Sequence, residues 1–513
     1  MSGSDSRRWW VLAALVLSAI VVGVDVNVLS VALPTLATDL GASTAQLQWI
    51  VNSYTLVGAA LLLPAGMLGD RYGRKRLLLG ALIVFGVASA ASTFAPTANA
   101  LIVGRAVLGA AAAFIIPLTI AVLPVLFQGE ERSRAVAIAT AANIAALPIG
   151  PIVGGVILSN FWWGAIFLIN VPTVAIAVLA VARLMPESRG STVGRLDVVG
   201  FVASSAALVA LVYGVIAAGE NGWTDPATLS ALAFGTIALV LFGAWEVRLE
   251  GRGGQPLVDL SLFRSRAFTA GSALATLIVF AMFGMSFTTP QYFQAVGGAD
   301  VLGVGLRMLP MVAGLLVGAG VAQRFGGRIG TKATVATGFL ILAAAFGVGA
   351  TTTVASGDLF VLGWITAMGF GLGVAMPTTI DAALGALSAD RAGAGTALLF
   401  SIRQVGGAFG VAILGSVLNG AYRSRVDVAG LSPEAAAAAQ KSVFGGIAVA
   451  QQEGSAALLD SAVASFMSGM DLLLVVCAGI ALVAAGVAVA FLPNAAATEA
   501  HEDRLEPALE GSA

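Results

Sequence analysis

The chain alternates between long apolar segments and short polar ones. A helix that crosses the hydrocarbon core of a bilayer needs about 20 apolar residues, because each residue advances it by about 1.5 Å. Segments of this length recur along most of the chain and predict fourteen transmembrane helices. They cover residues 10–33, 47–67, 77–95, 99–122, 134–158, 163–182, 198–218, 227–247, 268–289, 302–322, 331–351, 358–383, 394–418 and 469–492.

These segments predict an all-α membrane protein. Backbone polar groups in lipid must be bonded within a helix or a closed barrel, and the segments are too long and too uniformly apolar for barrel strands. Arg7 and Arg8 precede the first apolar segment, as in a signal peptide, but no cleavage-site pattern interrupts that segment before Pro34. We therefore expect it to be retained as the first helix.

The distribution of basic residues predicts an orientation. If residues 1–9 lie in the cytoplasm, most lysines and arginines fall in cytoplasmic loops, and the six short outer loops contain neither residue. The outer exceptions are Arg423, Arg425 and Lys441, all in the long loop 419–468. We predict a multi-pass protein of the inner (plasma) membrane with both termini in the cytoplasm, including a disordered polar tail, 493–513.

A weak internal repeat divides the chain. Residues 66–76 (GMLGDRYGRKR) and 322–332 (AQRFGGRIGTK) form basic, glycine-containing turns in corresponding inner loops. Related halves in one chain are typical of secondary transporters, whose substrate site lies between the halves. We predict an N-terminal six-helix half at 10–182, a C-terminal six-helix half at 268–492, and a linker at 183–267 that holds two extra helices and a polar interfacial segment.

The outer loop 419–468 contains a helix-start signal. Ser432 is a capping residue directly before Pro433, which would occupy the first helical position, and Glu434 follows. Because the next residues are rich in alanine, we expect a helical hairpin here. A tether that only spaces the flanking helices is the alternative.

Composition excludes several classes of function. Hydrophobic residues make up 58% of the chain and charged residues 10%, whereas soluble domains carry about 25% charged residues. The net charge of -1 provides no general field for nucleic acid. With one cysteine, Cys477, and one histidine, His501, we expect no disulfide framework, no metal or enzyme centre and no cofactor. The turn at 326–332 lacks the spacing of a phosphate-binding loop, which argues against a nucleotide-driven pump.

Several motifs resemble those of a known transporter family. Residues 66–76 resemble the G-x-L-x-D-R-x-G-R-[KR]-[KR] loop of the major facilitator superfamily, with Asp70, Gly73 and Arg74 in register. Three segments resemble its drug:proton antiporter branch, namely 25–34 (DVNVLSVALP), 101–113 (LIVGRAVLGAAAA) and 146–155 (ALPIGPIVGG). Likeness at 167–172 (FLINVP), 256–263 (PLVDLSLF) and 403–417 (RQVGGAFGVAILGSV) extends over nearly the whole membrane domain.

The resemblance is strongest to the fourteen-helix members of that branch, which include quaternary-ammonium and antibiotic exporters. It implies a major-facilitator-like fold of two six-helix pseudo-repeat halves plus two extra central helices, with the proton gradient as energy source. The chain departs from the pattern at Ala146, where the branch usually has glycine. Cation exporters carry acidic residues in helices 2 and 13, where this chain has Asn52, Leu399, Phe400 and Gln404. A preference for polycations is therefore not implied.

Asp25 and Arg105 are the candidates for proton coupling. A charged side chain in the middle of a transmembrane helix costs about 2.5–3.5 kcal/mol on insertion scales, so we expect Asp25 to have a function. Counted from the outer helix ends, Asp25 lies at a depth of about 12 Å and Arg105 at about 10 Å, so the two are level. We predict an ion pair in which Asp25 exchanges protons as its distance from Arg105 changes. A static structural ion pair is the alternative.

The fifth apolar segment is a candidate gate. Gly150 and Gly154 form a G-x-x-x-G face beside Gly155, and Pro148 and Pro151 remove backbone donors and should bend the helix. The resemblance implies a gating and anti-leak role for this helix. Helix packing without gating is the alternative, because both act through the same contact.

The first basic inner loop is a second candidate for conformational control. The resemblance implies a charge latch, in which Asp70 caps a neighbouring helix end or pairs with an arginine in one conformation only. Anchoring of the topology by the basic residues is the alternative. The candidate residues of this loop are Gly66, Asp70, Arg71, Gly73, Arg74 and Lys75.

Polar residues within the apolar segments are candidates for a substrate cavity. Arg403 lies near mid-depth in the thirteenth segment, on a face with Gly410. An arginine that lines a cavity would disfavour cationic substrates and favour neutral, zwitterionic or anionic ones; packing against the backbone is the alternative. The other candidates are Asn27, Asn52, Asn143, Gln291, Arg307 and Gln404.

The sequence as a whole predicts a proton-coupled antiporter and no enzymatic activity. We expect it to export small lipophilic molecules, such as drugs or antibiotics, from the cytoplasm or the inner leaflet by alternating access. Its expected partners are the substrate, protons and membrane lipids, and we expect a monomer that does not bind nucleic acid. A lipid or metabolite facilitator of the same fold is the alternative, which transport under an imposed pH gradient would distinguish.

Overall fold

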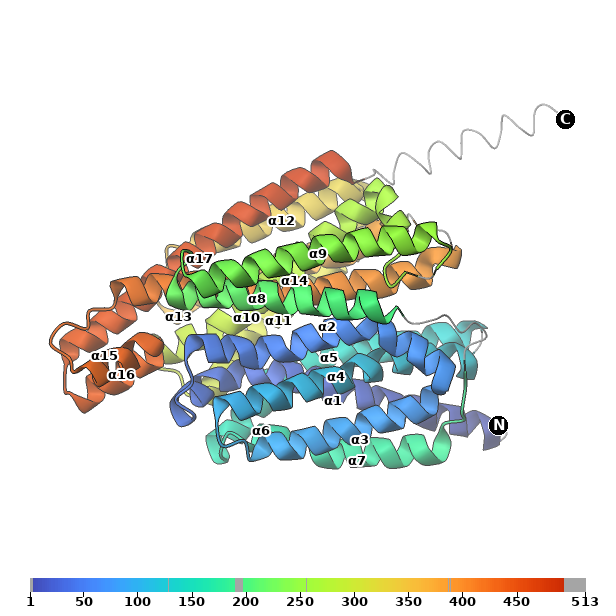
Figure 1. Cartoon of the computed structure of the whole chain (residues 1–513), viewed down its shortest axis with the longest axis horizontal. Coiled ribbons are helices and arrows are strands. Elements are labelled where there is room, and N and C mark those ends of the chain that lie inside the picture. Colours follow the sequence, from blue (N-terminus) through green and yellow to red (C-terminus); the bar gives the residue numbers. More distant parts are fainter. Residues whose placement is uncertain are drawn as a thin grey trace. The chain divides into compact units, whose positions relative to one another are not determined.

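The computed structural model describes residues 3–127, 129–189, 197–254, 256–385, 387 and 389–492, and the regular elements in these ranges are all helices (Figure 1). In chain order they are α1 Gly3–Asp39, α2 Thr44–Tyr72, α3 Arg74–Thr93, α4 Ala98–Leu126, α5 Gly129–Asn160, α6 Ala165–Leu168, α7 Asn170–Leu184, α8 Val198–Asn221, α9 Pro226–Gly251, η1 Leu260–Arg264, α10 Arg266–Ala295, α11 Val301–Ile329, α12 Thr331–Gly349, α13 Asp358–Leu384, α14 Ala389–Arg425, α15 Pro433–Lys441, α16 Val443–Gln452 and α17 Ala456–Phe491. The predicted all-α class is confirmed for these residues. The predicted tail, 493–513, lies outside them.

Most predicted apolar segments correspond to one long helix. Within the described residues, twelve helices are long and apolar enough to cross a membrane. Helices α2 and α5 occupy the second and fifth predicted segments but are not among these twelve, so the count of fourteen stays a prediction. The sixth predicted segment contains α6 and α7, which are interrupted at Ile169 although its torsion angles remain helical. Pro172 contributes to the interruption because it cannot donate a hydrogen bond to Leu168.

The chain divides into two compact units. Unit 1 contains Met1–Val258, Phe283–Met308 and Gly407–Gly469, and unit 2 contains Asp259–Met282, Leu309–Gly406 and Met470–Ala513. The chain passes from one unit to the other within α10, α11, α14 and α17, because these boundaries fall inside the helices. The division into two six-helix halves with a central linker stays a prediction.

Unit 1 contains the N-terminal helices, and small residues let them approach one another. Helix α1 packs against α5 and α7, α2 packs against α4, and α3 packs against both α4 and α7. A side chain at Gly109 of α4 would collide with the backbone of Tyr54 in α2, so the α2–α4 contact requires glycine there. These contacts place α1, α2, α4 and α7 around the polar site described below.

Helices α8 and α9 belong to the same unit. Helix α8 packs against α9 and α2. It also holds the part of α14 that lies in unit 1, because Ser416 donates a hydrogen bond to the carbonyl oxygen of Val215 (2.9 Å) and Asn419 donates one to that of Gly219 (3.3 Å). Helix α8 is therefore bonded to the other helices of unit 1. The insertion of this pair between two halves stays a prediction.

The predicted helical hairpin within residues 419–468 is confirmed as α15 and α16. The hydroxyl of Ser432 accepts a hydrogen bond from the backbone N–H of Ala435, and Pro433 is the first helical residue. Helices α14 and α17 occupy the two ends of the predicted loop, because their helical hydrogen bonding continues beyond the apolar segments. The hydroxyl of Tyr422 lies 2.8 Å from the carbonyl oxygen of Ala439, which fastens the hairpin to α14.

Unit 2 has a core of closely packed small residues. Helix α12 packs along α13, where a Cβ at Gly338 would lie 2.8 Å from the Cβ of Ala375. On another face of α13, Gly369 and Gly373 lie directly against the backbone of α11, at Met311 and Leu315. Glycine at these positions allows interhelical distances that larger side chains would prevent.

Candidate proton-coupling site

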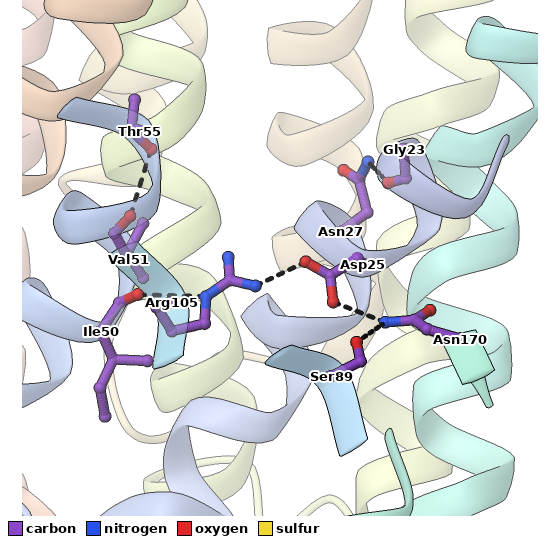
Figure 2. A network of polar contacts seen from close by, with 9 residues as sticks. All are labelled: Gly23, Asp25, Asn27, Ile50, Val51, Thr55, Ser89, Arg105 and Asn170. Carbon is purple, nitrogen blue, oxygen red and sulfur yellow. Dashed lines mark hydrogen bonds and ion pairs between the residues drawn. The ribbon is translucent and has the colours of Figure 1, made fainter. Parts of the chain in front are cut away.

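A buried ion pair lies in the middle of unit 1 (Figure 2). Asp25 is on α1 and Arg105 is on α4, and their exposed fractions are 0% and 1%. Nη1 of Arg105 donates a hydrogen bond to Oδ2 of Asp25 at 2.6 Å. The structure therefore contains the ion pair that the depth argument predicts, because the two helices place both residues at the same level.

Helix α2 holds Arg105 from a second side. Nε of Arg105 donates a hydrogen bond to the carbonyl oxygen of Ile50 at 3.3 Å. The guanidinium group also lies over the ring of Tyr54, with its central carbon 4.3 Å from the ring centroid. A cation over an aromatic ring in a buried site contributes about 2 kcal/mol. Arg105 is thus oriented by α2 as well as by Asp25.

Asn170 on α7 completes the coordination of Asp25. Its Nδ2 donates a hydrogen bond to Oδ1 of Asp25 at 2.8 Å and another to the hydroxyl oxygen of Ser89 on α3 at 3.0 Å. Each carboxylate oxygen therefore has its own donor, and Figure 2 shows how they converge from α4 and α7. Sequence reasoning missed Asn170 and Ser89. The motif FLINVP includes Asn170, and a polar residue in an apolar segment close to Pro172 was a signal for a functional side chain.

The arrangement compensates the buried charges of Asp25 and Arg105. In the ionised state, the negative charge of Asp25 is neutralised by Arg105 and bonded by Asn170. Burying two charges requires such compensation, because removal of one partner from a buried pair costs about 3–5 kcal/mol. Addition of a proton to Asp25 would neutralise it and leave the Arg105 charge uncompensated. A change in protonation would therefore alter the forces between α1 and α4.

The α5 candidates lie against α1 and the start of α11, all within unit 1. A Cβ at Gly150 would lie 2.5 Å from the Cβ of Asn27, and one at Gly155 would lie 2.9 Å from the Cα of Leu302. Gly154 likewise faces Val28 of α1. The side chains of Pro148 and Asn143 lie outside the described residues. The three glycines therefore permit backbone contact on two sides of α5.

The contact between α5 and α11 also depends on a glycine that sequence reasoning missed. A Cβ at Gly305 of α11 would lie 2.6 Å from the carbonyl oxygen of Pro151. The departure at Ala146 has a similar explanation, because its methyl group faces Gly23 of α1, where a Cβ would lie 2.7 Å away. The small residue needed at this α1–α5 crossing is thus supplied by α1.

The basic loop at residues 66–76 is bonded to the segment after α7. Gly73 ends α2 with a φ of 107°, and the backbone N–H of Lys75 donates a hydrogen bond to Oε1 of Glu187 at 3.0 Å. Arg76 forms an ion pair with the same carboxylate at 3.7 Å, and the backbone N–H of Arg74 donates to the carbonyl oxygen of Ser188 at 2.9 Å. Glu187 was not predicted.

Not every loop candidate takes part in this bonding. Arg71 is exposed and lies over the ring of Tyr72, with 5.4 Å between its central guanidinium carbon and the ring centroid. Gly66 lies within α2, and the side chain of Asp70 lies outside the described residues. The proposed latch of Asp70 therefore stays a prediction, whereas Lys75 and Arg76 have an acidic partner in Glu187.

Two cavity candidates in unit 1 bond to their own helices. Nδ2 of Asn27 donates a hydrogen bond to the carbonyl oxygen of Gly23 at 2.7 Å, and Nε2 of Gln291 donates to that of Phe287 at 2.8 Å. Arg307 lies over the ring of Phe293. These contacts explain how the three polar side chains are accommodated, and none identifies a substrate.

Two other candidates keep unused hydrogen-bonding atoms. Asn52 on α2 is fully buried, and both polar atoms of its amide lack a hydrogen-bond partner. In unit 2, Arg403 is 8% exposed, lies over the ring of Phe400 and has no partner for Nε. Gln404, beside Arg403 on α14, is partly exposed. Because unpartnered buried polar atoms are costly, Asn52 and Arg403 are available to bind a further group.

Similarity to known proteins indicates the family of the chain. The family model described as "Major Facilitator Superfamily" matches residues 15–411. The chain is 36% identical to the "Multidrug efflux pump LfrA" of Mycolicibacterium smegmatis, with 94% of this chain and 96% of the relative covered. It is 32% identical to the "Tetracenomycin C resistance and export protein" of Streptomyces glaucescens, with coverage of 95% and 92%.

Solved structures share the fold at low sequence identity. A bacterial homologue of the human lysosomal transporter Spinster, in an inward-facing and unoccupied conformation, has a TM-score of 0.67 and 17% identity, with 96% of this chain and 100% of that chain covered. A D-xylose-proton symporter has a TM-score of 0.59 and 13% identity, with coverage of 95% and 98%. The family match, the shared fold and the predicted motifs together establish that the chain belongs to the Major Facilitator Superfamily.

Proposed function

We propose that this protein is a proton-coupled antiporter that exports small lipophilic molecules, such as drugs or antibiotics. The observation that carries the proposal is the buried Asp25–Arg105 ion pair. Its carboxylate and guanidinium groups come from different helices, so a proton that binds to Asp25 would change the contact between α1 and α4. The relatives named as a multidrug efflux pump and as an antibiotic export protein support the substrate class, because they match over nearly their whole length.

The proposed cycle uses protonation of Asp25 to change the packing of α1 and α4. When Asp25 is ionised, Arg105 and Asn170 hold it between the two helices. A proton from outside would neutralise Asp25 and weaken this contact, and release of the proton to the cytoplasm would restore it. One charge that crosses a potential of 100 mV supplies about 2.3 kcal/mol, before any contribution from the pH gradient.

The glycine contacts of α5 support a gating role at the outer side. Gly155 and the carbonyl group of Pro151 lie against the first turns of α11, at Leu302 and Gly305. We place these turns at the outer membrane surface, on the orientation that the basic residues favour. Close contact there would seal the transport pathway on the outside and prevent protons from leaking across. The loop at Gly73 and Lys75, held by Glu187, would act at the opposite surface.

The proposed topology has fourteen membrane-spanning helices, with α2 and α5 added to the twelve candidate spans. Both termini would lie in the cytoplasm, and the protein would act in the inner (plasma) membrane as a monomer that needs no cofactor. The α8–α9 pair would be the insertion between two six-helix halves. Helix α2 belongs to the bundle because it provides the carbonyl oxygen of Ile50 and the ring of Tyr54 to Arg105.

In each unit taken by itself, buried polar atoms that lack partners are candidates for contact with the substrate. In unit 1, Asn52 offers an amide that can both donate and accept, and in unit 2, Arg403 offers a positive charge. Because Arg403 would repel cations, we expect neutral, zwitterionic or anionic substrates to be exported better than cationic ones. An unpartnered buried polar group costs about 1–3 kcal/mol. A substrate group that bonds to such an atom would remove this cost, which adds to the free energy of binding.

The test is transport by the purified full chain in liposomes that contain a trapped pH-sensitive dye. Cationic, neutral and anionic antibiotics and dyes are added in turn, with and without a protonophore. An exported compound should drive a proton flux in the opposite direction in the wild type and in Asp39→Asn, which removes an exposed acid of the same helix. Asp25→Asn should abolish this flux. Proton flux that is unchanged in Asp25→Asn, or transport without proton flux, would rule out the antiport mechanism; the latter result indicates a facilitator.

A further inference from the structure

A second pair of buried acidic side chains lies at the α8–α9 pair, on elements that contribute nothing to the Asp25 site. Asp197 directly precedes α8 and is 9% exposed, and Glu246 is near the end of α9 and is 0% exposed. Both belong to unit 1. Two buried carboxyl groups in one place require an explanation, because isolated charges are rarely buried without a partner.

Three of the four carboxyl oxygens accept hydrogen bonds from neutral donors. Oδ1 of Asp197 accepts from the backbone N–H of Gly200 (3.0 Å), and Oδ2 accepts from the indole N–H of Trp245 (2.8 Å). Oε2 of Glu246 accepts from the backbone N–H of Val258 (2.9 Å). The fourth oxygen, Oε1 of Glu246, has no hydrogen-bond donor. The site therefore orients both groups and leaves one oxygen unused.

That unused oxygen faces the other carboxyl group. A Cβ at Gly200 would lie 2.5 Å from Oε1 of Glu246 and even closer to Oδ2 of Asp197, so the two oxygens converge over this glycine. A residue larger than glycine at this position would push them apart. The geometry thus brings together Oδ2 of Asp197, which already accepts from Trp245, and Oε1 of Glu246, which has no donor.

None of the charged side chains that the structure describes around the pair neutralises it. Among the residues that the structure describes, no lysine or arginine lies within 4.0 Å of either carboxyl group. The other charged residues on α9 and in the segment that follows it are Arg248, Glu250, Arg252 and Asp259, whose carboxylate bonds to Ser261 instead. Glu220 lies at the far end of α8, and Arg195, two residues before Asp197, lies outside the described residues. Arg248, Glu250 and Arg252 are all exposed. Two neighbouring buried carboxyl groups without a cation cannot both remain ionised, because each disfavours the charge of the other.

We propose that Asp197 and Glu246 form a second proton-binding site, which holds one proton between Oε1 of Glu246 and Oδ2 of Asp197. The proton supplies the missing donor, so that the neutral carboxyl group of Glu246 donates to the carboxylate of Asp197. Its ligand is a single hydrogen ion, and the pair titrates as one unit. This assignment does not depend on the proposed antiport, because it involves neither Asp25 nor Arg105.

The two carboxyl groups also bind the backbone at Val258 and at Gly200. Glu246 accepts from Val258, which is the last residue of unit 1 before unit 2 begins at Asp259. Asp197 caps the start of α8 through Gly200. Loss of the shared proton would place two negative charges side by side and force one carboxyl group away. The bonds that hold Val258 and the first turn of α8 would then weaken together.

Infrared spectroscopy of the purified full chain in lipid nanodiscs tests the proposal. The wild type at neutral pH should show an absorption band of a protonated carboxyl group, which shifts in heavy water. Glu246→Gln should lose this band, whereas Glu250→Gln, an exposed acid of the same helix, and Asp25→Asn should keep it. An identical band in the wild type and Glu246→Gln, or no such band in the wild type, would overturn the proposal.

Thermal unfolding gives a second, independent measurement. Glu246→Gln keeps an acceptor for Val258 and gains an amide donor toward Asp197, so it should fold and imitate the protonated pair. Asp197→Asn keeps the cap of α8 and likewise removes one charge. Raising the pH from about 5 to about 9 should lower the Tm of the wild type relative to both variants, because the proton that the native pair holds is lost. A Tm difference that does not change with pH would overturn the proposal.

Discussion

Nη1 of Arg105 lies 2.6 Å from Oδ2 of Asp25, and both side chains are buried. An ion pair so placed is stable only while both charges are present. The first two predictions follow from this dependence.

Removal of the arginine should destabilise the protein and abolish transport. Arg105→Ala leaves Asp25 unpaired, and we expect a loss of about 3–5 kcal/mol in the free energy of unfolding, measured by thermal unfolding in detergent. The double variant Arg105→Gln with Asp25→Asn contains no unpaired charge, so it should recover much of the stability without recovering proton flux. Wild-type efflux by Arg105→Ala would contradict the coupling role of the pair.

Asn170→Ala should weaken transport. The substitution removes the hydrogen bond to Oδ1 of Asp25 and leaves that buried oxygen without a donor, which costs about 1–3 kcal/mol. We expect a lower rate of efflux and a lower Tm than in the wild type. Ser89→Ala is the control, because it removes the other acceptor of Asn170 and leaves the bond to Asp25 intact. Equal efflux in Asn170→Ala and Ser89→Ala would contradict a role for this bond.

Gly305→Leu should open a leak for protons. The new side chain would collide with the carbonyl group of Pro151 and separate α11 from α5. We expect an increased proton flux into liposomes without added substrate. Gly320→Leu is a matched control on the same helix, because a Cβ at Gly320 meets nothing within 4 Å. Equal proton leak in the two variants would show that the α5–α11 contact does not seal the pathway.

Gly73→Ala should slow transport while leaving substrate affinity largely unchanged. Its φ of 107° strains any L-residue with a side chain, and a Cβ would lie 2.7 Å from Oε1 of Glu187, displacing it from Lys75. Gly41→Ala is the control for backbone strain, because Gly41 also has a positive φ of 57° but a Cβ there meets no atom within 4 Å. Turnover and substrate binding are measured separately. Equal turnover in both variants would exclude a role for the Glu187 contact.

Tyr422→Phe should loosen the α15–α16 hairpin. The hydroxyl group lies 2.8 Å from the carbonyl oxygen of Ala439 and 3.1 Å from that of Ser442, and its removal leaves buried acceptors without this donor. We expect a loss of about 1–3 kcal/mol in local stability and faster proteolysis between α14 and α17. Tyr213→Phe, at a tyrosine that is 48% exposed, should leave the cleavage rate unchanged. Unchanged cleavage in Tyr422→Phe would contradict the anchoring role.

The sequence by itself determined the features that depend on composition and local order. The length of the apolar segments predicted the helices, since a chain in lipid has few other ways to bond its backbone. The order of Ser432 and Pro433 predicted where α15 begins, because capping needs only neighbouring residues. Depth along two helices predicted the pairing of Asp25 with Arg105, since the rise per residue is constant.

Only the tertiary structure decided which residues meet from distant parts of the chain. Asn170 and Ser89 are ordinary polar residues in sequence, and they become partners of Asp25 because α7 and α3 pack beside each other and α1. Gly305, Glu187 and the pair of Asp197 with Glu246 were missed for the same reason. Helix periodicity states which face a residue occupies, but the neighbour that covers that face depends on how the helices pack.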